Sequence, residues 1–162
     1  MVRSDSTKVT TLDWVVVGAG LLAYISSFFP WYRAHVSVLG VERFTGADNA
    51  WSAGFGAWFS VLLLVMAGVL VLASTMGLRL PASRPLLTLG LSALALITIL
   101  VRWVTFPDAT GGRGDLGQLG DVDVDGLFAV SSGAGLGLYL GLIAAIAAVV
   151  ASLGASRNVQ RG

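Results

Sequence analysis

The chain has 162 residues, of which 56% are hydrophobic and 12% charged, and its formal net charge is +1. Ordinary soluble domains carry about 45–50% apolar and about 25% charged residues. These numbers exclude a free cytosolic enzyme, a disordered chain and a nucleic-acid-binding protein, which needs a strongly basic face. The absence of cysteine also excludes disulfides and thiolate metal sites. The composition indicates an integral membrane protein.

Four apolar stretches are long enough to cross a bilayer, which takes about 20 residues of helix. They run from about residue 12 to 29, 54 to 76, 86 to 106 and 127 to 153, and the membrane part of the last is expected to begin near Ser131. Because lipid offers no partner to open backbone groups, the spans are predicted to be helices. The predicted fold is an all-α membrane protein, in which residues 1–162 form one bundle of four transmembrane helices.

The distribution of Lys and Arg predicts the orientation, because short cytoplasmic flanks are enriched in both. Six of these residues lie in the leader, in the loop before the third span and in the tail, whereas three lie in the two longer loops. Both termini are therefore predicted to be cytoplasmic, in a multi-pass protein of the plasma membrane. The longer loops, about 30–53 and 107–126, then face outward.

The two outer loops are expected to form a small cap that contains short β-strands. The segment Val36–Gly46 is rich in β-branched residues and has a suitable turn position at Gly40, so a hairpin is predicted. In the second loop, Asp121, Asp123 and Asp125 alternate with valines. A sheet that joined both loops would bury the valines of both.

The same three aspartates are the strongest metal-ligand pattern in the sequence. Together with Gly126 they match positions 1, 3, 5 and 6 of an EF-hand loop, where alternate carboxylates bind Ca²⁺. Position 12 requires a bidentate Glu but is Ser132, so the complete motif fails. Two interpretations remain: a weak Ca²⁺ site, which is the one cofactor suggested, and a solvated acidic strand edge, which the failed motif favours.

Arg102 is the only charge deep in a predicted span. Its long side chain can reach the outer headgroups, pair with an aspartate of the following loop, or bind a substrate. Most Trp residues lie near the ends of the spans, which is typical of interfacial anchors. The alternative is an outer binding surface, formed by Trp31, Tyr32, Arg33, Trp51, Arg102 and Trp103.

The fourth span carries a small residue at every fourth position, at Gly133, Gly137, Gly141 and Ala145. Such a ridge lies on one helix face and lets another helix approach closely, which is how helices associate in lipid. The neighbouring helix is expected either within the chain or in another chain. The oligomeric state stays open.

Two short runs resemble a known kind of protein. The first span ends in Ser26-Ser27-Phe28-Phe29-Pro30-Trp31-Tyr32, and the second opens with Asn49-Ala50-Trp51-Ser52-Ala53-Gly54-Phe55. They resemble small four-helix membrane proteins of actinobacteria, whose first helix often ends in Phe-x-Pro-Trp-Tyr and whose second opens with Ala-Trp-x-x-Gly. The resemblance implies a plasma-membrane location and a four-helix fold, and it implies no activity and no catalytic residue.

No catalytic set is recognised, because the single histidine, His35, lies in an outer loop without triad partners. Packing glycines are plentiful and the middle of each span is uncharged. The leading hypothesis is therefore a non-enzymatic accessory or scaffold subunit of a bacterial envelope complex, which contacts another membrane protein or a second copy of itself. The alternative hypothesis is a small-molecule or lipid binding or transport protein of the plasma membrane.

Overall fold

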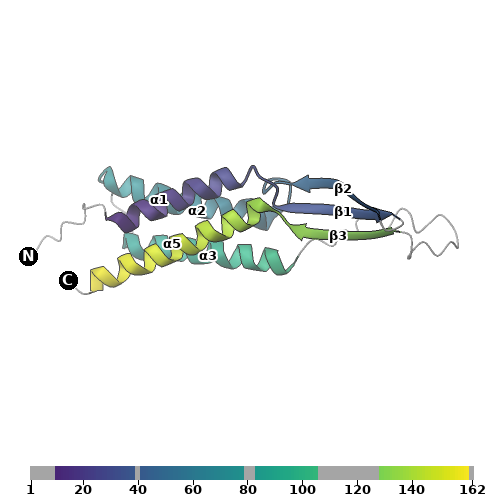
Figure 1. Ribbon diagram of the computed structural model, residues 1–162. Coiled ribbons are helices and arrows are strands. Elements are labelled where there is room, and N and C mark those ends of the chain that lie inside the picture. The colour runs from purple at the N-terminus through teal and green to yellow at the C-terminus, as the bar shows by residue number, and fades with distance from the viewer. Residues whose placement is uncertain (1–9, 39–40, 79–82, 106–127, 161–162) are drawn as a thin grey trace, which may run out of the picture.

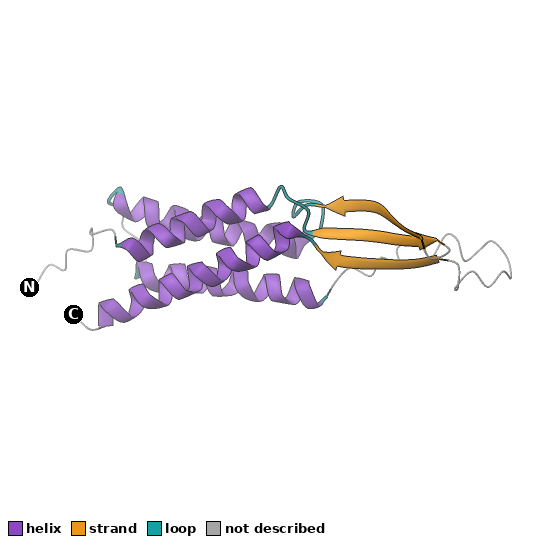
Figure 2. Cartoon of the chain, in the orientation of Figure 1, coloured by secondary structure: helices purple, strands orange, loops and turns teal. Residues whose placement is uncertain are grey.

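The computed structural model describes residues 10–38, 41–78, 83–105 and 128–160. Most of these are helical, and the helices are α1 (Thr11–Ser26), α2 (Phe55–Thr75), α3 (Arg84–Val104) and α5 (Leu136–Gln160). They run alternately up and down in one bundle, and strands β1 (Tyr32–Val38), β2 (Val41–Asp48) and β3 (Phe128–Ala134) project from one end of it (Figures 1 and 2). At the opposite end, α1 begins and α5 ends (Figure 1).

Each helix packs mainly against two neighbours, in the cyclic order α1, α2, α3, α5. Small residues bring α1 and α2 close together. A Cβ on Gly20 would lie 2.8 Å from the carbonyl oxygen of Leu64, and one on Gly68 would lie 3.4 Å from Cα of Val17. In lipid no hydrophobic force drives helices together, so close backbone packing of this kind is what holds them.

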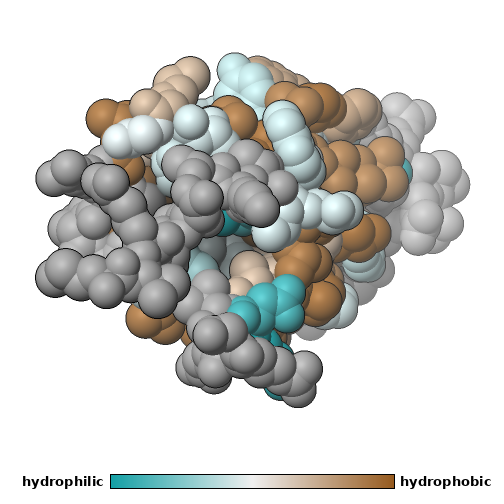
Figure 3. Space-filling view, turned by 90° about the vertical axis from the view of Figure 1, so that its left-hand side faces the viewer, coloured by the Kyte–Doolittle hydropathy of each residue, from teal (hydrophilic) through white to brown (hydrophobic). Residues whose placement is uncertain are grey.

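The outside of the bundle is apolar on all four helices. Exposed side chains include Leu21 of α1, Met66 of α2, Ile97 of α3 and Ile143 of α5. Seen from the end opposite the sheet, apolar residues show around much of the rim (Figure 3). The helices α2, α3 and α5 are long and apolar enough to cross a membrane. The apolar helix α1 has 16 residues, which is about 24 Å at 1.5 Å per residue.

The first helix ends three residues earlier than the predicted span, at Ser26. Pro30 lacks an N–H and disfavours helical conformation in the residue before it. The N–H of Trp31 donates to the carbonyl of Asp48 at 2.8 Å, which begins the strand pairing. The helices α2 and α3 agree with their predicted spans to within two residues.

The fourth helix begins later than predicted. Residues 128–134, expected as its first turns, form β3, which pairs antiparallel with β1 from Tyr32↔Ala134 to Val38↔Phe128. A short apolar run is compatible with either helix or strand by periodicity, and here the pairing with β1 decides. The helix α5 then runs to Gln160, seven residues beyond the predicted end at 153.

The sheet has the order β2-β1-β3 and is antiparallel throughout. The strands β1 and β2 form the expected hairpin, paired from Val38↔Val41 to Tyr32↔Asp48 with a register shift between Ala34 and His35. The residues expected to join this hairpin, 121–126, lie outside the described residues. In the described chain, β3 pairs along the other side of β1.

Candidate functional site

Trp31 lies where the bundle meets the sheet, and it is completely buried. Its indole N–H donates to the carbonyl oxygen of Ser26 at 2.9 Å, so its polar edge has a partner inside the protein. The ring lies against two glycines of α5. A Cβ on Gly137 would overlap Cδ1 of the indole, and one on Gly141 would lie 3.0 Å from its Cζ2. The indole therefore occupies the space that side chains at these positions would need.

Backbone hydrogen bonds join the same two segments. The N–H of Gly135 donates to the carbonyl of Trp31 at 2.7 Å, and the N–H of Gly137 donates to the carbonyl of Pro30 at 2.9 Å. A Cβ on Gly135 would overlap the backbone of Pro30. The start of β1 and the β3–α5 joint are thus held together by both backbone and side chain, and we call this region the junction.

The segment between β2 and α2 is also attached to the end of α1. The N–H of Ala50 donates to the carbonyl of Ser27 at 3.1 Å. The indole N–H of Trp51 donates to Oγ of Ser27, also at 3.1 Å. Asn49 Oδ1 accepts from the N–H groups of Trp51 and Ser52 at 3.0 and 3.1 Å, which is a side-chain-supported turn. These contacts fix where the sheet returns to the bundle.

Arg102 reaches the junction from α3. Its Nη2 donates to the carbonyl oxygen of Ala53, and its Cζ lies 5.4 Å from the centroid of the Tyr32 ring, within the range of a cation–π interaction. Gly54 has φ +101°, and a Cβ there would lie 3.2 Å from Nη2. Both the backbone conformation and the available space therefore favour glycine at this position.

The positive charge of Arg102 has no described carboxylate within 4 Å. Its Nε is buried and has no hydrogen-bond partner among the described residues. The aspartates of the following loop, which the sequence suggests as partners, lie outside those residues. Burial raises the pKa of the neighbouring Tyr32 hydroxyl above 10.0, although Arg102 acts in the opposite direction. The Tyr32 side chain is therefore neutral at physiological pH.

A second polar cluster lies at the opposite end of the bundle. Asp13 Oδ2 is 2.7 Å from Nη2 of Arg84 in an ion pair, and Nη1 of Arg84 donates to Oγ of Ser74 at 2.9 Å. Thr10 caps α1, and its N–H donates to the same carboxylate at 2.8 Å. The cluster joins α1, α2 and α3. Sequence reasoning missed this pair, whose members are 71 positions apart.

The predicted small-residue ridge is only partly helical. Gly133 lies in β3, and no atom would lie within 4 Å of its Cβ. Gly137 and Gly141 face the Trp31 indole, and Ala145 is completely buried. Of the three ridge residues that lie in α5, two therefore pack against a buried aromatic side chain, and not only against a neighbouring helix.

The six residues predicted as an outer binding surface do not form one exposed surface. Trp31 and Tyr32 are buried, because the junction uses both as internal packing residues, whereas Arg33 is exposed on β1. Trp51 is 43% exposed and Trp103 is 36% exposed. Trp103 packs edge-on against Tyr139 of α5, with ring centroids 6.3 Å apart. The structure brings Tyr32 and Arg102 together beside the junction, where Tyr32 is buried and Arg102 is half-buried.

The predicted Ca²⁺ ligands Asp121, Asp123 and Asp125 lie outside the described residues. Within residues 10–38, 41–78, 83–105 and 128–160, no three His, Cys, Asp or Glu side chains are grouped so that they could hold a metal ion.

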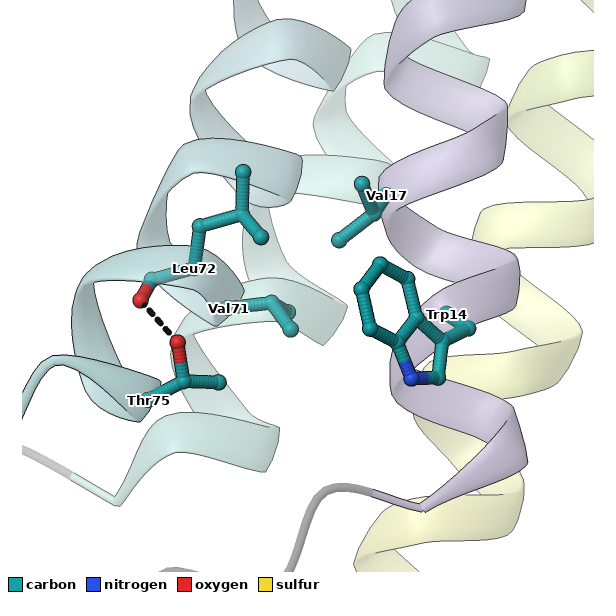
Figure 4. Close-up of a pocket in the computed structure, with 5 residues that line it drawn as sticks. All are labelled: Trp14, Val17, Val71, Leu72 and Thr75. Atoms are coloured by element: carbon teal, nitrogen blue, oxygen red, sulfur yellow. Dashed lines mark hydrogen bonds between the residues drawn. The ribbon is translucent and has the colours of Figure 1, made fainter.

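A shallow apolar pocket lies between α1 and α2 (Figure 4). It encloses about 120 Å³ and is lined by Trp14, Val17, Val71, Leu72 and Thr75. The polar side-chain groups of the lining are the indole N–H of Trp14 and the hydroxyl of Thr75. The hydroxyl of Thr75 donates to the carbonyl of Leu72 at 2.6 Å. Pockets for small-molecule ligands usually enclose about 300–1,000 Å³. This pocket is therefore too small for a ligand of ordinary size.

No model of a known protein family matches the chain, and the comparison with curated proteins finds no significant match. The resemblance to small actinobacterial membrane proteins stays a prediction. The function is therefore inferred from the geometry of the junction and from the surface of the helices.

Proposed function

We propose that the protein is a non-enzymatic accessory or scaffold subunit of a bacterial envelope complex, anchored by four membrane-spanning helices. The length and apolarity of α2, α3 and α5 support this anchoring. The shorter α1 packs between α2 and α5 and carries exposed apolar side chains such as Leu21 and Ile25. We assign it as the fourth span, completed to the thickness of the bilayer by the residues that lead to Pro30.

The proposed orientation places both termini in the cytoplasm and the sheet outside. Arg84 begins α3 and Arg157 lies in the last turn of α5, at the end of the bundle opposite the sheet. Cytoplasmic ends of spans are enriched in Arg and Lys. The six basic residues of the leader, the short loop and the tail support the same orientation.

The observation that carries the proposed function is the way the sheet is attached. Trp31, the backbone bonds of Gly135 and the turn at Asn49 join it to the ends of α1, α5 and α2. Its strands have seven or eight residues and extend about 23–26 Å at about 3.3 Å per residue. A sheet held this firmly is suited to presenting a surface at a set distance from the membrane.

The sheet also has groups available to a partner. No described helix packs extensively against it, and β2 and β3 each pair with a described strand on one side only. Unpaired strand edges are the usual sites at which another protein adds a strand. A second envelope protein that docks on this sheet is therefore the proposed partner.

The alternative, a small-molecule or lipid binding or transport protein, has less support. Trp31 and Tyr32 are used inside the junction, and the pocket between α1 and α2 is small.

Site-specific photo-crosslinking in native membranes tests the proposal. A photoreactive amino acid is placed at Arg33 or Ala47, which are paired and exposed in the sheet, and at Ile143, which is 58% exposed on α5, as the matched control. We expect a discrete protein product from the two sheet positions and none of that size from Ile143. The same products from all three positions, or none from the sheet, would contradict the proposal.

A further inference from the structure

We infer that Arg102 binds a phosphate group, and that this phosphate belongs to the headgroup of an anionic phospholipid in the outer leaflet. The site lies beside the junction, where α3 ends and α2 begins. The lipid assignment rests on the proposed membrane orientation, whereas the anion site rests on contacts within the chain.

The first observation is the unbalanced charge of Arg102. A guanidinium has five N–H donors, and here Nη2 donates to the carbonyl of Ala53 while the buried Nε has no described partner. No described carboxylate lies within 4 Å. Charged side chains at the ends of membrane spans normally pair or reach the headgroups, because an unpaired buried charge is costly. An anion bound at this half-buried guanidinium would neutralise its charge.

The second observation is the beginning of α2 beside the same guanidinium. Its N-cap is Gly54, which makes no side-chain cap, and its first turn has no acidic residue. A Cβ on Gly54 would lie 3.2 Å from Nη2 of Arg102, so the cation and the positive end of the helix dipole are adjacent. Two positive groups in contact repel each other, and a phosphate relieves both. Arginine matches phosphate geometry through two parallel N–H donors.

The third observation is the rigid placement of the side chain. The Tyr32 ring lies under the guanidinium and the Ala53 carbonyl holds one of its corners. Both contacts involve uncharged groups, so they orient the cation without neutralising it. The guanidinium is therefore held in one orientation, as a binding site requires.

The position of the site favours a lipid as the source of the phosphate. Arg102 lies two residues before the end of α3, and the exposed side chains of Phe55, Trp103 and Val104 surround the same end of the bundle. Aromatic side chains at span ends lie at the level of the headgroups. A headgroup phosphate reaches this level without leaving the bilayer, whereas a free anion must come from solution.

Native mass spectrometry of the full-length protein in mild detergent tests the inference. The probes are phosphatidylglycerol, a diacylglycerol with the same acyl chains but no phosphate, and inorganic phosphate. We expect one tightly bound phosphatidylglycerol per chain and no retained diacylglycerol. The variant Arg102→Gln should bind phosphatidylglycerol at least about tenfold more weakly, because it lacks the charge and the forked donors that would hold the phosphate.

The matched control is Arg33→Gln, which removes an exposed arginine on the same side of the bundle and should leave lipid binding unchanged. If Arg102→Gln does not fold, Arg102→Lys retains the charge but loses the forked geometry, and it should still weaken binding. Equal binding of phosphatidylglycerol by wild type and the Arg102 variant, or equal retention of diacylglycerol, overturns the inference. Inorganic phosphate that binds as tightly as phosphatidylglycerol overturns the lipid assignment.

One further variant separates a lipid from a carboxylate of the chain itself. In Asp121→Asn/Asp123→Asn/Asp125→Asn, lipid binding should be unchanged. If only this variant binds phosphatidylglycerol, the aspartates already neutralise Arg102 in the wild type, and the inference is wrong. Neither result affects the crosslinks from the sheet, so the proposed function is tested separately.

Discussion

Replacing Gly137 with alanine tests whether the contact between Trp31 and α5 holds the sheet on the bundle. Alanine is normally better than glycine inside a helix by about 0.5–1 kcal/mol. At this position its Cβ would overlap the Trp31 indole and would lie 2.7 Å from the carbonyl oxygen of Ser26 and 2.8 Å from that of Phe29. Two of these neighbours are backbone atoms, which cannot rotate away.

The expected cost follows from these distances. Overpacking of this kind destabilises a protein by about 1–3 kcal/mol. The matched control is Gly90→Ala in α3, where no atom lies within 4 Å of the added Cβ, so the helix preference of alanine should act alone. The two variants should therefore differ by about 1.5–4 kcal/mol. Gly141→Ala, whose Cβ would lie 3.0 Å from the indole Cζ2, should fall between them.

The free energy of unfolding can be measured by titrating SDS into detergent micelles and following helicity by circular dichroism. Tryptophan fluorescence in the same titration reports the exposure of the indoles, including Trp31. Equal stability of Gly137→Ala and Gly90→Ala would refute the reasoning. If Gly137 instead faced another chain, the variant would keep wild-type stability and lose only the proteins that co-purify with it.

Three further predictions concern other parts of the chain. The variant Asp13→Asn should destabilise the bundle by about 1–3 kcal/mol, because it leaves a partly buried Arg84 without its carboxylate. In a double-mutant cycle, the double variant Asp13→Asn/Arg84→Gln should lose less stability than the sum of the two single losses. Burial raises the folded-state pKa of Tyr32 above 10.0, so the contribution of this side chain to stability should be lost as the pH rises above about 10. The variant Tyr32→Phe should lack the part of the tyrosinate absorbance that Tyr32 contributes above that pH. A reporter that works only in the cytoplasm should be active when it is fused after Gly162, and activity of the same reporter at Gly112 in the outer loop would contradict the proposed orientation.

Composition and apolar run length were enough to predict a helical bundle with apolar sides. The predicted limits of α2 and α3 are within two residues of those in the structure, because charge and glycine bound these runs on both sides. The hairpin of β1 and β2 was also predicted, since β-branched residues flank a suitable turn near Gly40. These features depend on local patterns, which the sequence contains in full.

Contacts between distant segments were not predictable in the same way. Residues 128–134 are a strand because their backbone groups pair with β1, about 95 positions earlier in the chain, and an apolar run does not reveal such a partner. The small-residue spacing on the fourth helix was visible, but its occupant, the Trp31 indole, was not.

By itself, the sequence determined that this protein has apolar helices suited to a bilayer and that a hairpin follows the first helix. Only the tertiary structure decided which of the aromatic and charged residues are internal. In the sequence, Trp31 and Arg102 were both candidates for the same outer binding surface. The Trp31 indole is enclosed by glycines and its N–H donates to Ser26. Arg102 donates to the carbonyl of Ala53, and its Nε has no described partner. The physical reason is that burial and hydrogen-bond partners depend on which segments approach one another, and that approach is set by the packing of the whole bundle.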